Sequence, residues 1–513
     1  MAALKLYTVF HLNLAYSSLK ESDLPLVIQK CYWPLLNLAK KYKIAIEAPA
    51  YTLEKIKKID PYWIEKLKEL IAENKCEFLG SGYSQLIGPL VPAEVNKQNL
   101  KVGNEIYAEI FGSAPKISYL NEQAYSQGLI EHYLEAGYEA MMMEWNNPRE
   151  FHPEWDKELQ YHAQTAVSQN GEKISVIWNN PIAFQKFQRY AHGEMGTEEY
   201  LGYLASHIGE EKRFFPLYGS DAEVFDFRPG RYGTEAEIQG GEFLRIEDLF
   251  EKLSGDERFE LAAASELLKD ETARQEISLE SPEQPIPVKK QGKYNVVRWG
   301  LTGRDDLKIN TQCYRLFYSK AKDWKTLCYL WNSDFRTHAE EEKFQKFLEE
   351  LGNSEFEEQP SEPSEVSIKK DGRMLIAESK NIKLELNCDR GLAINSLIFK
   401  KISEKSLIGT LNHGYFDDIS LGADFYTGHT IIEIPGKPKI TDLSKTDTSQ
   451  LGAVITCEYG TIKKIISISE DSVNLDYEFD LTDLPMCSFK TGVVTLNPEA
   501  FDRKSLYVSC CNG

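Results

Sequence analysis

The first 290 residues alternate short apolar runs with longer segments of helical periodicity. Runs such as KLYTVFHLN, KIAI and CEFL are each followed by a segment whose apolar side chains recur every three or four positions. Strands that alternate with helices in this way form βαβ units and a parallel sheet. About seven units occur, which favours a closed barrel over an open sheet, and no GxGxxG or P-loop pattern follows the first run. The predicted helices cover residues 24–42, 53–74, 92–111, 127–136, 197–208 and 245–254.

The remainder of the chain predicts two further parts. Residues 275–300 are rich in proline and charge, so we place the end of the barrel at residue 290 and a helical subdomain at residues 291–355. An acidic linker with proline and serine comes next. In residues 366–513 apolar and polar residues alternate between turns, which predicts an antiparallel β-sandwich. No closing element follows the last strand-like run, so we expect the sequence to be truncated there.

The charge balance disfavours several kinds of partner. With 59 basic and 79 acidic residues the net charge is −20, whereas nucleic acids and anionic membranes attract clustered Lys and Arg. An uncharged oligo- or polysaccharide is compatible with such a surface. We therefore expect no nucleic-acid and no membrane partner, and the sequence leaves formation of a homo-oligomer open.

The cellular compartment follows from the cysteines and the N-terminal segment. Nine cysteines are scattered along the chain without a CxxC pair, which indicates free thiols in a reducing environment. The first residues lack the pattern of a signal peptide, and no segment has the ~18 apolar residues that a membrane helix needs. We expect a cytoplasmic protein.

Two carboxylates stand where apolar, strand-like runs end. Glu122 follows KISYL, and Asp221 follows FFPLY. In a barrel of parallel strands the loops after the strands build the active site, because the carboxyl ends of the strands meet at one face. Cleavage of a glycosidic bond with retention uses two carboxyl groups, one as nucleophile and one as acid and then base. Glu122 and Asp221 are therefore the candidate catalytic residues, although either one alone is more often a surface or capping carboxylate.

The neighbours of these two carboxylates suit a sugar substrate. Tyrosine, asparagine and glutamine residues flank Glu122, while Glu223 and two phenylalanines follow Asp221. Aromatic rings pack against the apolar faces of sugars, and amides bond to their hydroxyl groups. A catalytic acid keeps its proton near neutral pH only beside an apolar or like-charged neighbour, and Glu223 is placed to be that like charge.

Other strand ends supply candidate substrate-binding residues. Glu47 follows the run KIAI, and Glu144 with Trp145 follows EAMMM. Tyr83 and Gln85 lie in a glycine-containing loop after CEFL, where they are placed to meet a sugar hydroxyl. For Tyr83 and Gln85 a tight turn with a packed tyrosine is an equally good explanation.

Four segments together resemble glycoside hydrolase family 57. They are FHLN, EFLGSGYSQLIGPLVP, SYLNEQAYS and YGSDAEVFD, and they occur in the family's order between residues 5 and 240. The family contains retaining α-amylases, 4-α-glucanotransferases, branching enzymes, amylopullulanases and α-galactosidases. The resemblance implies a (β/α)7 barrel with Glu122 as nucleophile and Asp221 as general acid/base. It also implies that His11 and Glu223 line the pocket.

The chain departs from the family pattern at positions that touch sugar. The family's first segment usually reads His-x-His-Gln-Pro, whereas here Asn13 replaces the second histidine. Tyr119 and Leu120 stand where relatives often carry tryptophan, and Ala222 stands where glycine is common. The two carboxylates are kept, so these departures concern the identity of the substrate.

A fifth resemblance lies in the helical part of the chain. Trp331 and Asp334 in LWNSDFRTH resemble the family segment that reaches back over the barrel mouth. A helix cap by Asp334 is the alternative. His11 with Asn13 supplies too few ligands for zinc, which takes three or four His, Cys or carboxylate groups. We expect no metal ion and no cofactor in catalysis.

The sequence therefore predicts a retaining glycosidase or transglycosidase that acts on α-linked glycans through a covalent intermediate. Two alternatives stay open. One is a non-catalytic glycan-binding relative, which the changed first segment keeps in view. The other is a barrel resembling polysaccharide deacetylases, which would need a metal-binding Asp and His set that the sequence does not offer.

Overall fold

The computed structural model describes residues 3–502 with several gaps. The residues outside the description are 169, 229–239, 282, 285, 289–296, 301–302, 320–322, 337–338, 353–365, 412–425 and 447–450. The predicted linker therefore falls almost wholly outside the described residues. The predicted boundary at residue 290 lies outside them too, as do residues 503–513, at whose end we predict truncation. The chain divides into two compact units, Met1–Glu358 and Gln359–Val508.

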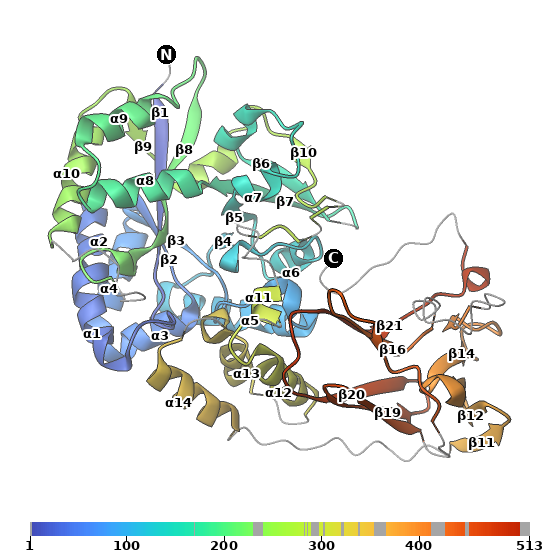
Figure 1. The fold of residues 1–513 in the computed structure, drawn as a ribbon. Helices are drawn as coiled ribbons and strands as arrows, with labels where there is room; N and C mark the ends of the chain where they lie inside the picture. Colours follow the sequence, from blue (N-terminus) through green and yellow to red (C-terminus); the bar gives the residue numbers. More distant parts are fainter. Residues whose placement is uncertain are drawn as a thin grey trace. The chain divides into compact units, whose positions relative to one another are not determined.

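The first unit contains two sheets of mainly parallel strands (Figure 1). One sheet has the order β3-β2-β1-β8, with β9 also pairing with β1, and the other has the order β10-β6-β7-β5-β4. The bounds are β1 Leu4–His11, β2 Ile44–Glu47, β3 Cys76–Leu79, β4 Ile117–Tyr119, β5 Ala140–Glu144, β6 Gln164–Val167, β7 Lys173–Asn179, β8 Arg213–Asp221, β9 Phe259–Leu261 and β10 Glu276–Ile277.

Contacts at both seams join the two sheets into one curled layer. A parallel bridge between Gly80 and Ser118 continues β3 into β4. At the other seam the Asn179 side chain of β7 donates to the carbonyl oxygen of Gly219 in β8 over 2.7 Å. The seven strands β1, β2, β3, β4, β5, β7 and β8 thus follow one another around the layer, an arrangement that fits a (β/α)7 barrel.

Apolar side chains fill the inside of this layer. Alternate residues of a strand point to the same face, so each strand contributes every second residue. The inner cluster includes Tyr7, Val9, Ala45, Leu79, Ile117, Tyr119, Ala140, Met142, Ile177 and Phe214. The intervening residues of β1 and β2, such as Leu6 and Ile46, face outwards into a second core shared with the surrounding helices.

The helices that cover the strands largely match the predicted ones. Their bounds are α1 Leu24–Val27, the π-helical turn Ile28–Tyr32, α2 Trp33–Ala39, α3 Ala50–Ile59, α4 Pro61–Ala72, α5 Ala93–Phe111, α6 Leu129–Glu135, α7 Asn146–Arg149, α8 Pro181–Ala191, α9 Thr197–Ala205 and α10 Glu242–Ser254. The single helix predicted over residues 53–74 is wrong. Asp60 ends α3 and caps α4 by accepting a hydrogen bond from the Trp63 N–H, and Pro61 occupies the first position of α4.

Helices α11 to α14 follow in the same unit. They span Val297–Gly300, Asp306–Tyr318, Trp324–Leu330 and Glu341–Gly352, and a short 3-10 helix, Ser333–Arg336, lies between α13 and α14. Ile309, Leu330, Phe335 and Phe347 belong to the same outer core as the first two strands. The helical segment therefore shares one core with the outer faces of β1 and β2 and the helices around them.

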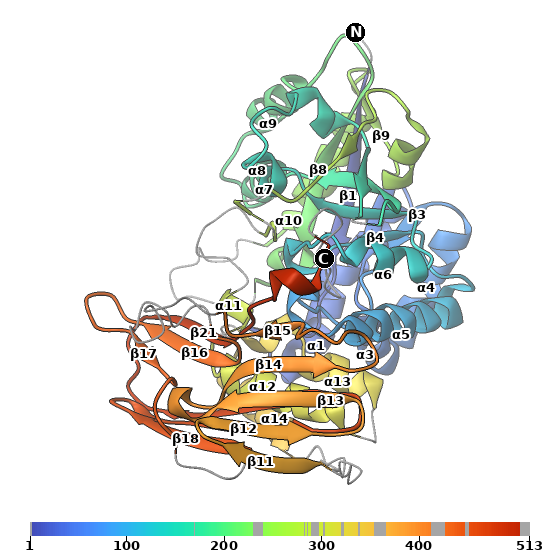
Figure 2. The same ribbon diagram turned by 90° about the vertical axis from the view of Figure 1, so that its right-hand side faces the viewer.

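The second unit consists of antiparallel strands. A five-stranded sheet, β11 to β15, and two three-stranded sheets, β17-β16-β21 and β18-β19-β20, make it up, and Figure 2 shows β11 to β14 side by side. Leu384 and Leu386 of the first sheet share a core with Ile455 and Ile466 of the third. The bounds are β11 Ser367–Asp371, β12 Met374–Glu378, β13 Ile382–Asn387, β14 Ala393–Phe399, β15 Ile408–Gly409, β16 His429–Glu433, β17 Ile440–Thr441, β18 Gly452–Cys457, β19 Gly460–Ile468, β20 Val473–Leu481 and β21 Ser488–Val493.

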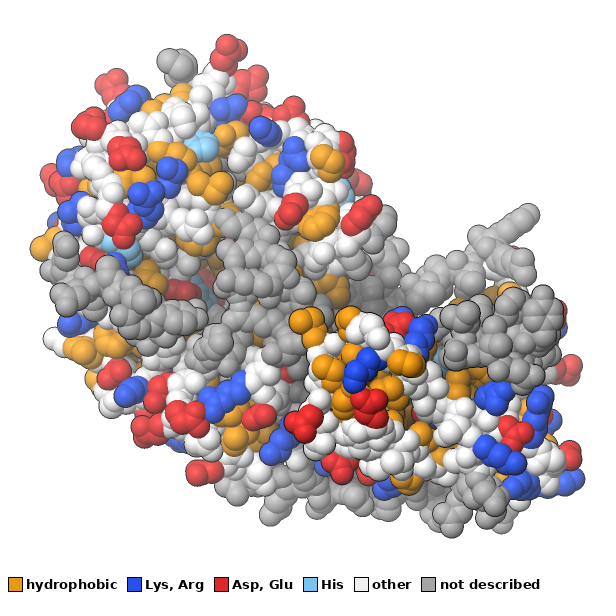
Figure 3. All heavy atoms as spheres, viewed as in Figure 1, with side chains coloured by type: hydrophobic (Ala, Val, Ile, Leu, Met, Phe, Trp, Pro, Cys, Tyr) orange, Lys and Arg blue, Asp and Glu red, His pale blue; other side chains and the backbone are white. Residues whose placement is uncertain are grey.

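The described surface carries charges of both signs. On the face drawn in Figure 3, acidic and basic side chains are interspersed, without a broad basic area among the described residues. Within the described part of the chain, no helix combines the length and the apolar character needed to span a membrane.

Candidate active site

The inner rows of apolar side chains end in polar residues at the carboxyl ends of the strands. Alternate side chains of a strand point to the same face, so His11 lies on the inner face of β1 with Tyr7 and Val9. The equivalent positions are Glu47 in β2, Glu144 in β5 and Asn179 in β7. In the register of β1 and β8, His11 stands opposite Asp221. The structure thus brings His11, Glu47, Glu144 and Asp221 to one end of the barrel layer.

His11 is held between carboxylates. Its Nδ1 bonds to Oε2 of Glu47, and its Nε2 contacts the Gln85 amide and lies 4.0 Å from Oδ1 of Asp221. Burial alone lowers the pKa of His11, but Glu47, assisted by Asp221 and Glu223, raises it to about 10. An imidazolium therefore stands beside Asp221 at neutral pH. The Asp221 side chain is 34% exposed, which leaves it accessible to a ligand.

Glu223 is buried just beyond Asp221. Its Oε1 accepts hydrogen bonds from the Asn13 N–H over 2.8 Å and from the Tyr32 hydroxyl. Its Oε2 has no hydrogen-bond partner among the described residues. Burial and the neighbouring Asp221 raise the pKa of Glu223 to about 7. Asp221 thus acts as the like charge for Glu223, which binds a proton as the pH falls below neutrality. The effect that the sequence predicts, of Glu223 on Asp221, stays a prediction.

Glu122 lies in a short 3-10 turn directly after β4. Its backbone adopts φ 51° and ψ 14°, a left-handed conformation that costs an L-residue about 1–3 kcal/mol and persists only where the surroundings hold it. The following residue, Gln123, fixes the turn, because its Oε1 accepts the Glu144 N–H over 2.6 Å and its Nε2 donates to the Leu120 carbonyl. Ser333 donates its hydroxyl to Oε1 of Glu122 over 3.1 Å.

Asp334 ties the helical segment to the first strand. Its Oδ2 accepts a hydrogen bond from the Asn13 side chain over 2.9 Å, and Oδ1 of Asn13 accepts the Ala15 N–H. Burial raises the pKa of Asp334, with a further contribution from the charge of Glu122. Bonds from Glu122 to Ser333, from Asp334 to Asn13 and from Asn13 to Glu223 thus connect the two sides of the site.

Three predicted site residues have their rings in aromatic packing. The Trp145 ring packs edge-on against Trp178 with centroids 5.1 Å apart, and Trp331 packs edge-on against Tyr314 at 5.2 Å. Tyr83 meets Tyr51 at 6.1 Å. All three predicted residues are buried. Their contribution to sugar binding stays a prediction, as do the roles of the other named residues.

Sequence reasoning missed three residues of this site. Asn179 donates to the Tyr119 hydroxyl and to the Gly219 carbonyl, Tyr32 bonds to Glu223, and Ser333 bonds to Glu122. Asn179 could have been found from the period of two in ISVIWN, which places it on the same face as Ile177. Tyr32 and Ser333 carry no local signal, because each reaches its partner only through the tertiary fold.

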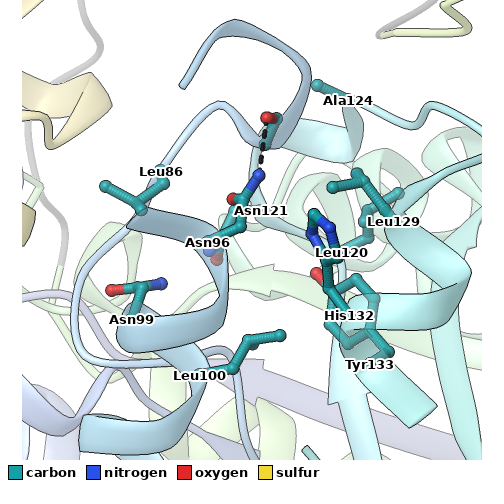
Figure 4. A pocket seen from close by; sticks show the side chains of 11 residues that line it. Leu86, Asn96, Asn99, Leu100, Leu120, Asn121, Ala124, Leu129, His132 and Tyr133 are labelled. Atoms are coloured by element: carbon teal, nitrogen blue, oxygen red, sulfur yellow. Dashed lines mark hydrogen bonds between the residues drawn. The ribbon is translucent and has the colours of Figure 1, made fainter. Parts of the chain in front are cut away.

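A small cavity adjoins the turn that carries Glu122. It measures about 10 Å³, about the room that one water molecule needs, and Figure 4 shows Asn96, Asn99 and His132 among the side chains around it. Leu120, Asn121 and Ala124 line it from the turn itself. Asn121 also donates to the Ser81 carbonyl over 3.0 Å. The cavity is far too small for a sugar. The Asn121 hydrogen bond ties the residue before Glu122 to the loop after β3.

The described residues contain no group of three or more His, Cys, Asp or Glu side chains arranged to hold a metal ion. The positive charge nearest to Asp221 in the described site is the His11 imidazolium. Catalysis without a metal stays a prediction.

Replacing Glu47 with Gln is expected to lower the pKa of His11 from about 10 to its ordinary value of 6.5 or below, because burial then outweighs the remaining carboxylates. Nitrogen-15 NMR of the imidazole against pH measures this, with the His11 signal assigned from a His11→Gln variant. Protonation of His11 also contributes to the free energy of unfolding, and this contribution depends on pH. In the native protein the His11 contribution is complete below pH 6.5 and is lost as the pH rises through about 10.

Glu77→Gln is the matched control for Glu47→Gln. Glu77 is also a strand carboxylate, in β3, but its oxygens accept the Ser265 N–H and do not contact a histidine. We expect this control to leave the titration of His11 unchanged. A Glu47→Gln protein in which His11 still titrates near pH 10 would contradict the assignment of Glu47 as the main cause.

Comparison of the sequence with curated proteins gives distant relatives. The chain is 27% identical over 206 residues to alpha-amylase 1 of Dictyoglomus thermophilum, a match that covers 40% of this chain and 29% of the relative. It is 25% identical over 247 residues to the alpha-amylase of Pyrococcus furiosus, covering 47% and 35% of the two chains. The chain therefore spans about a third of the length of these relatives.

Comparison of the structure gives two neighbours that share the fold. The 4-alpha-glucanotransferase from Thermococcus litoralis has a TM-score of 0.50 at 14% identity, covering 93% of this chain and 84% of that one. An alpha-mannosidase from Enterococcus faecalis has a TM-score of 0.51 at 10% identity, covering 90% and 67%. In addition, residues 8–280, more than half of the sequence, match the profile described as Glycosyl hydrolase family 57. The chain belongs to glycosyl hydrolase family 57.

Proposed function

We propose that this chain carries the catalytic machinery of a retaining glycosidase or transglycosidase that acts on α-linked glucans. Glu122 is the nucleophile, and Asp221 is the general acid and base. The observation that supports this most directly is the hydrogen-bonded connection from Glu122 through Ser333, Asp334 and Asn13 to Glu223, which lies two residues from Asp221. Family membership and the α-amylase relatives support the substrate class.

The first step forms a glycosyl-enzyme. An oxygen of Glu122 forms a bond to C1 of the sugar while the bond from C1 to the leaving oxygen breaks. Asp221 gives its proton to that leaving oxygen, and the shortened glucan departs as an alcohol. Glu122 must be ionised and Asp221 protonated for this step.

The second step releases the sugar. Asp221, now ionised, takes a proton from water or from a sugar hydroxyl, whose oxygen forms a new bond to C1 as the bond to Glu122 breaks. Two displacements at C1 retain the anomeric configuration. The acceptor determines whether the product is a hydrolysed or a transferred glucan.

The other members of the site bind and set the charge balance. His11 places a positive charge beside Asp221. The pKa of Glu223 is about 7, so Glu223 gains or loses a proton with small changes of pH around neutrality. The remaining residues assigned to substrate binding are Asn13, Glu47, Tyr83, Gln85, Glu144, Trp145, Trp331 and Asp334. We assign an oligo- or polysaccharide as the partner and no resident metal or cofactor.

The architecture and the location are part of the same proposal. The seven strands that follow one another around the layer support a (β/α)7 barrel. The shared core of Leu384 and Ile455 supports a β-sandwich in the second unit. We keep the division into a barrel at residues 1–290, a helical subdomain at 291–355 and a sandwich at 366–513 as a proposal. The free thiols of the seven described cysteines support a cytoplasmic location.

Covalent trapping tests the proposed chemistry. The protein is incubated with activated 5-fluoro and 2-fluoro α-glycosides, and its intact mass is measured before peptide mapping. The expected result is a mass increase of one fluoro-sugar on the peptide that contains Glu122. The fluorine slows both chemical steps, but the activated leaving group still allows the first, so the glycosyl-enzyme accumulates. Under the same conditions a Glu122→Gln variant is expected to gain no mass.

The alternatives give different results in that experiment. A folded protein that gains no sugar from any donor, but binds glucans by calorimetry, would support the non-catalytic relative instead. A protein whose activity requires a metal found by elemental analysis would support the deacetylase-like alternative. Either outcome overturns the proposed function.

A further inference from the structure

Ser333 reaches the proposed nucleophile from the helical segment. Its hydroxyl bonds to Oε1 of Glu122 over 3.1 Å across a separation of 211 residues, and its backbone N–H donates to the Gln85 carbonyl over 2.8 Å. The Ser333 residue is 1% exposed. An ionised carboxylate only accepts hydrogen bonds, so the Ser333 hydroxyl is the donor whenever Glu122 is charged.

A buried arginine fixes the turn that presents Ser333. The guanidinium of Arg336 is 1% exposed and donates to the carbonyl oxygens of Leu330 over 2.9 Å and Asn332 over 3.3 Å. It also donates twice to Oδ1 of Asn310, in α12, over 3.1 and 3.0 Å. Because a guanidinium is a rigid, planar set of donors, these bonds define the path of the chain on both sides of Ser333.

The neighbouring residue holds the same turn from the barrel side. Asp334 accepts the side-chain amide of Asn13, which follows β1. Ser333 therefore lies between two anchors, Arg336 in the helical segment and Asn13 in the barrel. The backbone of Ser333 therefore cannot move away from Glu122 without disturbing one of them.

We propose that Ser333 is a positioning residue for Glu122, which holds the carboxylate in one orientation and favours its ionised form. This inference rests on the proposed role of Glu122 as nucleophile. A hydrogen bond donated to the charged form of a carboxylate stabilises that form, so the Ser333 hydroxyl favours the state of Glu122 that attacks C1.

The same hydrogen bond acts at both chemical steps, and Ser333 keeps its own proton throughout. In the first step the charge of Glu122 disappears as its oxygen bonds to C1 and the leaving oxygen takes the proton of Asp221. In the second step the charge returns as water or a hydroxyl displaces Glu122. A donor aimed at the returning charge makes Glu122 a better leaving group, so loss of Ser333 slows release of the sugar in particular.

Three variants separate positioning from a general effect on packing. Ser333→Ala removes the hydroxyl, and Ser333→Thr keeps one at the same position. Ser84→Ala is the matched control, because Ser84 is equally buried in the contact with α13 but donates its hydroxyl to the Cys328 carbonyl over 2.7 Å. Each protein is assayed across the pH range with the aryl α-glycoside that the native protein accepts. The fraction of protein present as glycosyl-enzyme is measured in quenched samples by intact-protein mass spectrometry.

For Ser333→Ala we expect the acid limb of kcat/KM to move up by about one pH unit, since the nucleophile then loses its proton later. We expect kcat to fall about tenfold, and the glycosyl-enzyme to accumulate in the steady state. Ser333→Thr is expected to restore the native acid limb. Ser84→Ala is expected to leave the acid limb where it is, whatever its effect on stability.

A folded Ser333→Ala protein with the native acid limb and no accumulated intermediate would overturn the inference. Equal losses in the Ala and Thr variants, without a shift of the acid limb, would do the same and would indicate packing alone. Failure of the proposed function is seen separately in the native protein, which would then form no adduct on Glu122, and the inference would fall with it. An adduct on Glu122 together with an unaffected Ser333→Ala variant overturns only the role of Ser333.

Discussion

Glu122→Gln is expected to reduce kcat/KM on α-glycosides by at least about 10⁴-fold, because an amide cannot form the glycosyl ester on which turnover depends. The substitution keeps the shape of the side chain, and the amide carbonyl still accepts the hydrogen bond that Ser333 donates. We therefore expect the melting temperature to change little. Initial rates on the donor identified by trapping measure the loss, and thermal unfolding followed by circular dichroism checks the fold.

Rescue by an external nucleophile sharpens this test. A Glu122→Gly variant leaves a space that azide can enter, and attack by azide on an activated α-glycoside should give a glycosyl azide of inverted configuration. Glu109→Gln, which changes an exposed glutamate paired with Lys57, serves as the control and should keep native rates. Native activity in Glu122→Gln would rule out Glu122 as the nucleophile.

Lys464→Met is expected to lower the free energy of unfolding of the second unit by about 3–5 kcal/mol, because it leaves a buried carboxylate without its cation. Both side chains of the Lys464–Asp442 pair are 0% exposed, and their charged atoms lie 2.7 Å apart. Lys464 also donates to the Gly391 carbonyl, and Asp442 accepts the Thr430 N–H. Lys464 lies in β19, Thr430 in β16 and Gly391 just before β14, so the pair connects all three sheets of the second unit.

The double variant Lys464→Met/Asp442→Asn is the control for this pair. It removes both charges but keeps an oxygen for the Thr430 N–H, so we expect it to recover most of the lost stability. All eight tryptophans of the chain lie in the first unit. Urea unfolding of Lys464→Met should therefore move the loss of β-structure seen by circular dichroism to lower urea, while the tryptophan fluorescence transition stays in place. A single variant as stable as the native protein would show that this pair contributes nothing.

Much of the barrel could be predicted because its signals are local. Alternating apolar runs and amphipathic segments specify strands and helices within a few residues of each other, and the family segments mark which strand ends carry chemistry. The structure brings His11, Glu47 and Asp221 together for the same reason, since each extends the inner face of its own strand.

Other features could not be predicted because their causes are not local. The predicted helices do not include α8, although Asn180 caps it and Pro181 is its first residue. The cap follows the apolar run of β7 directly, so the sequence shows no separate start signal for the helix. The break at Asp60 was missed because the apolar periodicity continues through it. The hydrogen bond from Ser333 to Glu122 depends on how two segments 211 residues apart pack together. The periodicity of apolar residues within a segment does not predict such a contact.

Residues that meet in the site are made at very different times. Asn13 and Asp334 are 321 residues apart in sequence, yet their side chains share a hydrogen bond. At the usual rate of translation of about 5–20 residues per second, roughly 16 to 64 s pass between them on the ribosome. The strands of the barrel emerge well before the segment that completes the site. A nascent chain therefore holds Glu122, the proposed nucleophile, without Ser333 until the last helices of the first unit have left the ribosome.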